Sequence, residues 1–246
     1  MEKVKIANSG NPDKVLLVAN GNSDRNDILS HLLDKVTSPI VYVGKDYTSK
    51  YVNKAWVDWF GTDTIKITTN SELLDLSKIE AGKLELHCAE FNLEDLVEET
   101  VQDIRHTTSR HTIIVESQFE GKMYGDKDRI GQVLTNLLNN AIKYSPDAER
   151  VEVFVRGNNR NVSIRVKDFG IGIDKKEHQK IFERFYRVEG KTEQTCPGFG
   201  IGLFIAGEII HRHRGTIDVK SEKDRGTDFT INLTLNFRNE NQQVNA

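Results

Sequence analysis

The sequence has few of the features that mark a disulfide-rich, membrane-spanning or nucleic-acid-binding protein. Its two cysteines, Cys88 and Cys196, lie far apart and have no metal-binding spacing. No window approaches about 18 uninterrupted apolar residues, and the first residues lack the basic-then-apolar order of a signal peptide. The formal net charge of −3 argues against a broad nucleic-acid surface. We therefore expect a cytoplasmic chain with reduced thiols, no membrane segment and no nucleic-acid partner.

The composition is that of a globular protein, with 37% hydrophobic and 29% charged residues in a chain of 246. Composition and pattern change along the chain, and each change indicates a boundary between parts. We divide the chain into four parts: an N-terminal segment (1–61), a short helix and linker (62–87), an α+β domain (88–238) and a polar tail (239–246).

The first two parts predict only small elements. A strand at 39–43 with a hairpin partner at 47–52 is followed by a helix at 53–60. The leucines and isoleucine of 73–79 predict an amphipathic helix that ends at Gly82. This amount of chain is too short to close a large core of its own.

The α+β part alternates strands with amphipathic helices. Asn92 and Asp126 are suitable N-caps for the two long helices that follow them. The pattern predicts helices at 93–104, 126–144, 174–188 and 199–213, and strands at 83–91, 111–118, 123–124, 151–156, 162–167, 215–220 and 228–235.

The helix predicted at 126–144 has an unusual polar face. Asn136, Asn140 and Lys143 fall within about 60° of one another at 100° per residue, opposite an apolar stripe. Asparagine is unfavourable inside a helix, so its repetition here suggests a function. A carboxamide oxygen suits Mg²⁺, and a lysine one turn later suits the phosphates that share the metal. A solvated polar face is the alternative from this helix alone.

Two glycine-rich loops follow. Asp168 ends a predicted strand and begins Asp-Phe-Gly-Ile-Gly, where a fixed carboxylate could accept a hydrogen bond from an exocyclic amine such as that of adenine. Ordinary turn chemistry explains such a loop equally well by itself. Gly198, Gly200 and Gly202 open the helix at 199–213, where backbone N–H groups can approach phosphate oxygens. A dinucleotide fingerprint is disfavoured, because the spacing is GxGxG and no strand precedes it.

The segment between the loops carries aromatic and basic residues. Phe182 and Phe185 are three apart on the predicted helix and could anchor a flap over the site. Arg184 and Arg187 could reach a terminal phosphate. An ordinary amphipathic helix is the simpler interpretation of this segment taken alone.

The order of these segments is more specific than any one of them. NLLNNAIKYS, DFGIG, IFERFYR and GFGIGL, which lie within residues 126–206, resemble the N, G1, F and G2 boxes of the ATP-binding domain of sensor histidine kinases. That domain belongs to the superfamily of gyrase B, Hsp90 and MutL. The resemblance implies a two-layer α/β sandwich of the Bergerat type, in which a mixed sheet packs on three helices, here with a short N-terminal extension.

The resemblance also implies a role for each matching residue. Asn140 would bind Mg²⁺ and, with Lys143 and Arg187, act on the phosphates of ATP. Asp168 would accept the adenine amine, and residues 189–198 would form a lid. The residues that the resemblance places around ATP are Asn136, Asn140, Lys143, Tyr144, Asp168, Gly170, Gly172, Ile173, Gly198, Gly200, Ile201, Gly202, Leu203 and Thr227. Gyrase-like ATPases have a water-activating glutamate where Asn136 stands, so this chain resembles a phosphotransferase more than a hydrolase.

One expected part of a histidine kinase is missing from this sequence. No histidine lies in the His-Glu-x-x-x-Pro pattern of the phosphoacceptor, and His31 is only a faint match. Asp75–Leu86 resembles the end of the second dimerisation helix, and Thr37–Gly61 resembles the start of a PAS domain. The expected partners are therefore a separate histidine-containing dimerisation domain and a response-regulator receiver, and dimerisation of this chain is left open.

Three interpretations of the function follow. The chain transfers the γ-phosphoryl group of Mg²⁺–ATP to a histidine, in trans rather than in cis. It binds nucleotide without transfer, as a regulatory module. Or it is a serine kinase of the anti-sigma-factor type. The third interpretation is disfavoured, because Asp75–Leu86 resembles the end of a histidine kinase dimerisation helix.

Overall fold

A computed structural model of the chain describes most of the sequence beyond residue 70. The described residues are 5–8, 15–18, 33–36, 41–43, 49–60, 70–188 and 199–236. The chain divides into two compact units, one formed by residues 1–84 and 197–201 and the other by residues 85–196 and 202–246. None of the helices in the described part has the length and apolar character needed to cross a bilayer.

The described residues of the smaller unit include two short antiparallel strand pairs and two helices. Its elements are β1 (Lys5–Asn8), β2 (Val15–Val18), β3 (Val41–Val43), β4 (Ser49–Val52), α2 (Lys54–Phe60) and α4 (Asn70–Glu80). The predicted hairpin is confirmed, because β3 pairs antiparallel with β4. Asn53 is fully buried before α2, and its amide nitrogen donates to Leu33 O at 3.0 Å and Val36 O at 3.2 Å. Helix α4 ends at Glu80, two residues before the predicted end at Gly82, whose φ is +67°.

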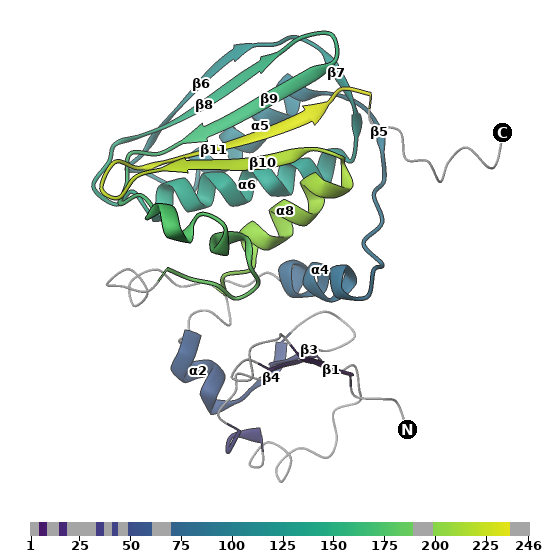
Figure 1. Ribbon diagram of the computed structural model, residues 1–246, viewed down its shortest axis with the longest axis vertical. Coiled ribbons are helices and arrows are strands. Elements are labelled where there is room, and N and C mark those ends of the chain that lie inside the picture. Colours follow the sequence, from purple (N-terminus) through teal and green to yellow (C-terminus); the bar gives the residue numbers. More distant parts are fainter. Residues whose placement is uncertain are drawn as a thin grey trace, which may run out of the picture. The chain divides into compact units, whose positions relative to one another are not determined.

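In its described residues, the larger unit has a five-stranded sheet covered on one face by three helices (Figure 1). The strand order is β10-β11-β9-β8-β6, in which only β6 and β8 run parallel. The strands are β6 (Thr112–Gln118), β8 (Arg150–Gly157), β9 (Asn161–Lys167), β10 (Thr216–Ser221) and β11 (Thr227–Thr234), and the helices are α5 (Leu93–Arg105), α6 (Lys127–Lys143) and α8 (Gly202–Arg212). The mixed sheet on three helices that the sequence predicted is confirmed.

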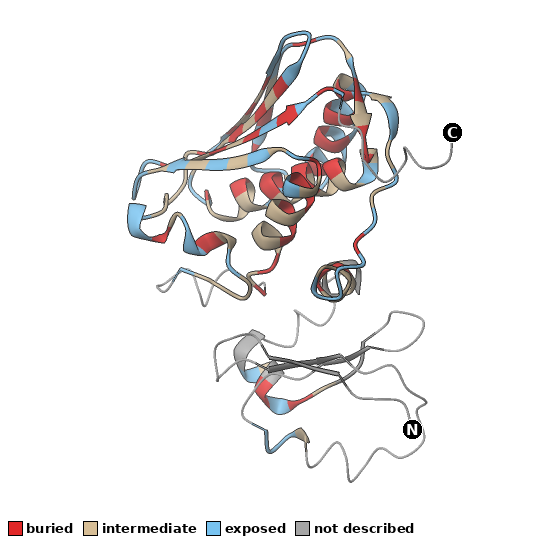
Figure 2. Cartoon of the chain, turned by 45° about the vertical axis from the view of Figure 1, so that its right-hand side comes forward, coloured by how far each residue is buried: buried red, intermediate tan, exposed pale blue. Residues whose placement is uncertain are grey.

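The core lies between the sheet and the helices, as the red residues of Figure 2 show. In β8 and β9 every second residue is buried, which is the pattern of strands with one face on a core. Helix α6 buries the stripe that the sequence indicated: Ile130, Val133, Leu134, Leu137, Leu138 and Ala141. At roughly 1.5–3 kcal/mol for each large apolar side chain, this stripe alone is a major source of stability.

A second, two-stranded sheet closes one end of the unit. Strand β5 (Ala89–Asn92) pairs antiparallel with β7 (Lys122–Gly125). Each strand leads to a helix whose cap the sequence predicted. The Asn92 side chain accepts from the N–H of Glu94 at 2.9 Å, and Asp126 Oδ1 accepts from the N–H of Arg129 at 3.1 Å. Residues 83–88, predicted as part of the first strand, are not extended into the ladder.

The prediction of one helix across residues 174–188 is wrong. The structure has two single turns of 3₁₀ helix, η1 (Lys175–Glu177) and η2 (Lys180–Phe182), and Phe185 adopts a φ of +61°. A left-handed residue ends any right-handed helix. Local side-chain bonds replace the helical ladder, because Asp174 caps Lys176 and the Tyr186 hydroxyl donates to Glu177 Oε2. The predicted helix at 199–213 likewise begins only at Gly202, since Gly200 has a φ of +67°.

A buried histidine joins the end of α8 to the start of α6. His213 has no exposed surface, its Nε2 accepts from the N–H of Asp126 at 3.0 Å, and its Nδ1 lies 2.8 Å from Ile209 O. One nitrogen must therefore accept and the other donate, which only the neutral ring can do. Burial lowers the pKa of His213, and the Ile209 carbonyl and Asp126 offset part of this effect.

This pKa shift predicts a loss of stability in mild acid. As pH falls below the ordinary histidine value of about 6.5, the unfolded chain gains a proton at His213 before the folded chain does, so the free energy of unfolding decreases. Urea unfolding at pH 7.5 and 5.5 measures the effect. His213→Gln should lose less stability across this interval than the parent, whereas His211→Gln, at an exposed position of the same helix end, should behave as the parent. An unchanged pH dependence in His213→Gln would contradict the assignment.

Candidate nucleotide-binding site

Helix α6 separates its apolar and polar faces as the sequence indicated. Asn136, Asn140 and Lys143 are all half-buried, in contrast to the buried stripe opposite and to the exposed Asn139. Half-burial places these three side chains at a boundary between core and solvent, where a ligand can reach them without unfolding the helix. The side chain of Asn140 has no hydrogen-bond partner among the described residues.

Asn136 differs from Asn140 on this face, because its side chain already forms a hydrogen bond within the protein. Its Nδ2 donates to the carbonyl oxygen of Gly202 at 2.8 Å, which ties α6 to the first residue of α8. A Cβ at position 202 would collide with the Asn136 carboxamide, so the contact requires glycine there. The structure thus shows Asn136 as a brace between two helices, a contact that the sequence did not predict.

The C-terminal end of α6 packs against the first glycine loop. The N–H of Ile171 donates to Tyr144 O at 3.0 Å, and a Cβ at Gly170 would clash with the same carbonyl. The Lys143 ammonium lies 5.0 Å from the centre of the Tyr144 ring. The loop and the helix predicted to share a site are therefore brought together, and glycine at 170 allows the close approach.

Asp168 organises the loop that follows β9. It is only 5% exposed, and its Oδ1 accepts from the N–H of Gly170 at 2.9 Å and of Thr227 at 3.1 Å. Its own N–H donates to Thr227 O at 2.8 Å, which continues the pairing of β9 with β11. Among the described residues, nothing bonds to Oδ2. One carboxylate oxygen thus fixes the backbone and the other is available to a ligand.

The environment of Asp168 opposes its negative charge. Burial raises the pKa of this carboxyl, the N–H groups of Gly170 and Thr227 lower it, and Asp228 raises it. The carboxylate is therefore held where its charge is poorly solvated. A hydrogen-bond donor from a ligand would relieve that cost, which favours binding of an amine at Oδ2.

The turn between β10 and β11 supports the loop from its other side. A Cβ at Gly226 would collide with Asp168 O, and one at Gly172 would collide with Glu222 O, and both glycines have positive φ. The Ser221 hydroxyl connects loop and turn, since it accepts from the N–H of Ile173 at 2.8 Å. The sequence did not predict this role for Ser221. The hairpin predicted there stopped one residue earlier, at 220.

The segment after the loop is fixed by aromatic contacts. The rings of Phe182 and Phe229 meet edge to face with centres 6.3 Å apart. The Arg184 guanidinium lies 5.7 Å from the centre of the Phe204 ring, which brings the segment to α8. Arg187, predicted near the phosphates, is half-buried at the end of this segment.

The remaining predicted site residues belong to the second glycine loop and the segment before it. Gly198 and the proposed lid at 189–198 lie outside the described residues. Gly200 has the positive φ expected of a glycine turn, and Leu203 lies half-buried in the first turn of α8. The roles of Gly198, Gly200, Ile201 and Leu203 therefore stay predictions.

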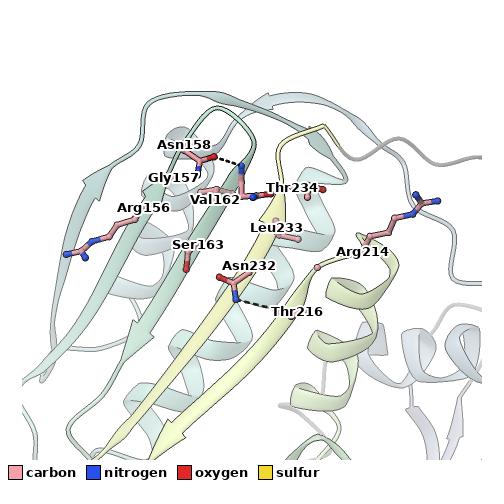
Figure 3. Close-up of a pocket in the computed structure, with 12 residues that line it drawn as sticks. Arg156, Gly157, Asn158, Val162, Ser163, Arg214, Thr216, Asn232, Leu233 and Thr234 are labelled. Carbon is pink, nitrogen blue, oxygen red and sulfur yellow. Dashed lines mark hydrogen bonds between the residues drawn. The ribbon is translucent and has the colours of Figure 1, made fainter.

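A separate hollow of about 570 Å³ lies at the opposite end of β9 and β11 (Figure 3). Several of its polar residues are bonded to one another or to a neighbouring residue. Asn158 accepts from the N–H groups of Arg160 and Asn161, and the Asn232 amide donates to Thr216 at 3.2 Å. The side chains of Arg156 and Arg214 point away from it in opposite directions. No convergent set of groups is present there, so the site at Asp168 is the better candidate.

The described residues contain no cluster of three or more histidine, cysteine, aspartate or glutamate side chains suited to a metal. A magnesium ion held with ATP does not need one, because it takes most of its oxygen ligands from phosphates and water. The Asn140 carboxamide is half-buried and has no hydrogen-bond partner within the described chain, and its role as a magnesium ligand stays a prediction.

The comparisons with known proteins agree with this geometry. Residues 125–237 match the family described as histidine kinase-, DNA gyrase B- and HSP90-like ATPase. Sensor histidine kinase WalK of Bacillus subtilis is 33% identical over 176 residues, which cover 70% of this chain and 28% of that protein. Sensor histidine kinase RcsC of Escherichia coli is 32% identical over 169 residues, covering 67% and 18%. The chain therefore spans less than a third of the length of these curated relatives.

A solved structure gives the same result for the fold. The mycobacterial sensor histidine kinase MprB is 26% identical with a TM-score of 0.53, and the match covers 59% of this chain and 96% of that chain. Residues 125–237 are a domain of the histidine kinase-, gyrase B- and HSP90-like ATPase family, of the kind that forms the ATP-binding catalytic module of sensor histidine kinases.

The brace at Asn136 gives a direct test of the site's architecture. Asn136→Asp replaces the donor to Gly202 O by a carboxylate that repels it, so we expect a loss of about 1–3 kcal/mol in the free energy of unfolding. Asn139→Asp makes the same change at the exposed neighbour and should alter stability by less than about 0.5 kcal/mol. Chemical denaturation at pH 7.5 measures both, and equal effects of the two substitutions would contradict the brace.

Proposed function

We propose that residues 88–238 bind Mg²⁺–ATP at the site around Asp168 and α6, and that they donate the γ-phosphoryl group to a histidine. The observation that carries the proposal is the state of the Asp168 carboxylate. Its Oδ1 is saturated by two backbone N–H groups, and its Oδ2 has no partner among the described residues. A buried acceptor arranged in this way fits the exocyclic amine of adenine.

The phosphate end of the nucleotide would lie along the polar face of α6. Asn140 and Lys143 are one turn apart on this face, half-buried and beside the loop that holds Asp168. Asn140 would hold Mg²⁺, which neutralises charge on the β- and γ-phosphates when bound. Lys143 and Arg187 would act on the phosphates as cations, with Tyr144 along the nucleotide. Gly170, Gly172, Ile173 and Thr227 would shape the adenine end.

The chemistry at Asn136 supports transfer rather than hydrolysis. A hydrolase needs a base that takes a proton from water, and a carboxamide cannot act as that base. Here the amide nitrogen is also bonded to Gly202 O, so the side chain is held as a structural contact. Water that enters this site would therefore meet no general base at position 136, and the γ-phosphate would persist until an acceptor arrives.

The acceptor histidine is proposed to be on a separate dimerisation domain, and the phosphoryl group would pass from there to a receiver aspartate. Residues 1–246 contain no His-Glu-x-x-x-Pro motif, so we propose none of their histidines as the acceptor. The same observation favours a second candidate function, a nucleotide-binding regulatory module without transfer. We place either function in the cytoplasm, where ATP is available, with residues 37–61 as a PAS-like segment.

The Asp168 assignment predicts opposite effects on binding and stability. Asp168→Asn keeps an oxygen for the N–H groups of Gly170 and Thr227 but presents a donor to the adenine amine. ATP affinity should fall about 10- to 100-fold, the cost of losing a hydrogen bond to a charged group. Folding raises the pKa of Asp168, so above that pKa the charged carboxylate lowers the free energy of unfolding. Asp168→Asn removes this charge, and without nucleotide it should therefore be no less stable than the parent at pH 7.5.

Isothermal titration with Mg²⁺–ATP and urea unfolding without nucleotide measure the two effects. Asp224→Asn is the matched control, since it removes the same charge at an exposed position of the β10–β11 turn. Its ATP affinity should equal that of the parent. Parental ATP affinity in Asp168→Asn would refute the proposed adenine site.

The transfer step predicts where labelled phosphate goes. With γ-labelled ATP, the chain alone should acquire no acid-labile label, and a purified histidine-containing dimerisation domain added to it should acquire one. Asn140→Ala should reduce transfer to this domain by at least about 10-fold, because it removes the proposed metal ligand, while Asn139→Ala should not. Acid-labile label on the chain alone would contradict transfer in trans, and ATP binding without any transfer would favour the regulatory module.

A further inference from the structure

Ser221 lies at the end of β10, directly opposite Thr227 on β11. Side chains of residues that face each other across an antiparallel pair lie on the same side of the sheet. Here they share the side that carries the buried residues of β11, including Phe229. The two hydroxyl oxygens are 3.1 Å apart, and Thr227 is only 6% exposed. The pair therefore lies beside the carboxylate of Asp168, to which the N–H of Thr227 donates.

The hydrogen-bond capacity of Ser221 is completely used. A serine hydroxyl has one hydrogen to donate and two lone pairs to accept with. The hydrogen goes to Gly226 O at 2.7 Å, and one lone pair accepts from the N–H of Ile173 at 2.8 Å. The remaining lone pair faces the Thr227 hydroxyl. Since Ser221 has no second hydrogen, Thr227 must be the donor in this bond.

This direction of donation fixes what Thr227 offers to a ligand. Its only hydroxyl hydrogen is committed to Ser221, so the oxygen has only lone pairs left. Beside it, Asp168 Oδ2 is likewise an acceptor without a partner in the described part of the chain. Within the described residues, Asp168 Oδ2 and the Thr227 hydroxyl oxygen are therefore two neighbouring groups that can only accept.

We infer that Ser221 is a positioning residue that gives the proposed adenine site its preference for a 6-aminopurine over a 6-oxopurine, by holding the Thr227 hydroxyl as an acceptor. The inference rests on the proposed adenine site and extends it to a residue outside that site. An exocyclic amine supplies hydrogens to both acceptors, directly or through one water. A carbonyl oxygen at the same position would place its lone pairs against those of Asp168 Oδ2 and the Thr227 hydroxyl oxygen. Rotation of the Thr227 hydroxyl could not relieve this repulsion, because its hydrogen is bonded to Ser221.

The test compares the affinities of Mg²⁺–ATP and Mg²⁺–inosine triphosphate, which differ at the 6-position and in the N1 proton that accompanies it. The parent should prefer ATP by at least about 10-fold, since a site with a polar group left unpaired rejects the wrong ligand strongly. In Ser221→Ala the Thr227 hydroxyl can rotate and donate to the carbonyl. The preference should then fall about 5- to 10-fold, close to the worth of one hydrogen bond.

Two further variants separate this effect from a general loosening of the loop. Ser221→Thr keeps the hydroxyl and should retain the parental preference. Thr227→Val keeps all bonds of Ser221 to Gly226 and Ile173 but removes the oriented hydroxyl, so the preference should fall as in Ser221→Ala. In the double variant the preference should fall no further, because both substitutions remove the same interaction.

The outcomes distinguish this inference from the proposed function. Parent protein that binds neither nucleotide would overturn both. Parent protein that binds ATP, with Ser221→Ala weakening both nucleotides equally, would overturn the role of Ser221 alone and leave the adenine site in place. A parental preference for ATP over inosine triphosphate in Thr227→Val would also overturn the role of Ser221 alone. This result can be obtained even if Ser221→Ala does not fold.

Discussion

The pairing of one carboxylate oxygen of Asp168 with two backbone N–H groups is the interaction on which the site depends. It joins the end of β9 to the first glycine loop through Gly170 and to the start of β11 through Thr227. A buried carboxylate is costly, and these two bonds offset part of that cost. The remaining cost is what makes the second oxygen an attractive partner for a donor from a ligand. Oδ1 of Asp168 thus holds the loop in place, and Oδ2 is the proposed acceptor for the ligand.

The glycines around Asp168 are consequences of the same close packing. Gly170, Gly172 and Gly226 each lie where a Cβ would strike a backbone carbonyl, of Tyr144, Glu222 and Asp168 respectively. The loop can therefore lie directly on the end of α6 and on the β10–β11 turn. Through these contacts, the helix that carries Asn140 and Lys143 is held in register with the carboxylate. The proposed phosphate and base sites, which lie on different elements, are thereby held next to each other.

Much of this could be predicted from the sequence, and the failures have physical causes. The caps at Asn92 and Asp126, the apolar stripe of α6 and the hairpin of β10 with β11 all follow local rules that tertiary packing did not override. The helix expected at 174–188 failed because Phe185 is left-handed and Glu177 binds Tyr186 in place of a helical ladder. The brace of Asn136 to Gly202 and the contacts of Ser221 join residues far apart in sequence, and no local pattern encodes them.

A nucleotide site built on Asp168 is tested most directly by NMR of the isotope-labelled chain, which maps the backbone amides that respond to Mg²⁺–ATP. We predict that the largest shifts on addition of nucleotide occur at residues 140–144, 168–173 and 221–227, with Gly170 and Thr227 among them. The hollow near Asn158 and Asn232, at the other end of the same strands, should be unaffected. Shifts centred on that hollow, or saturation with ATP that leaves Gly170 and Thr227 unchanged, would contradict a nucleotide site built on Asp168.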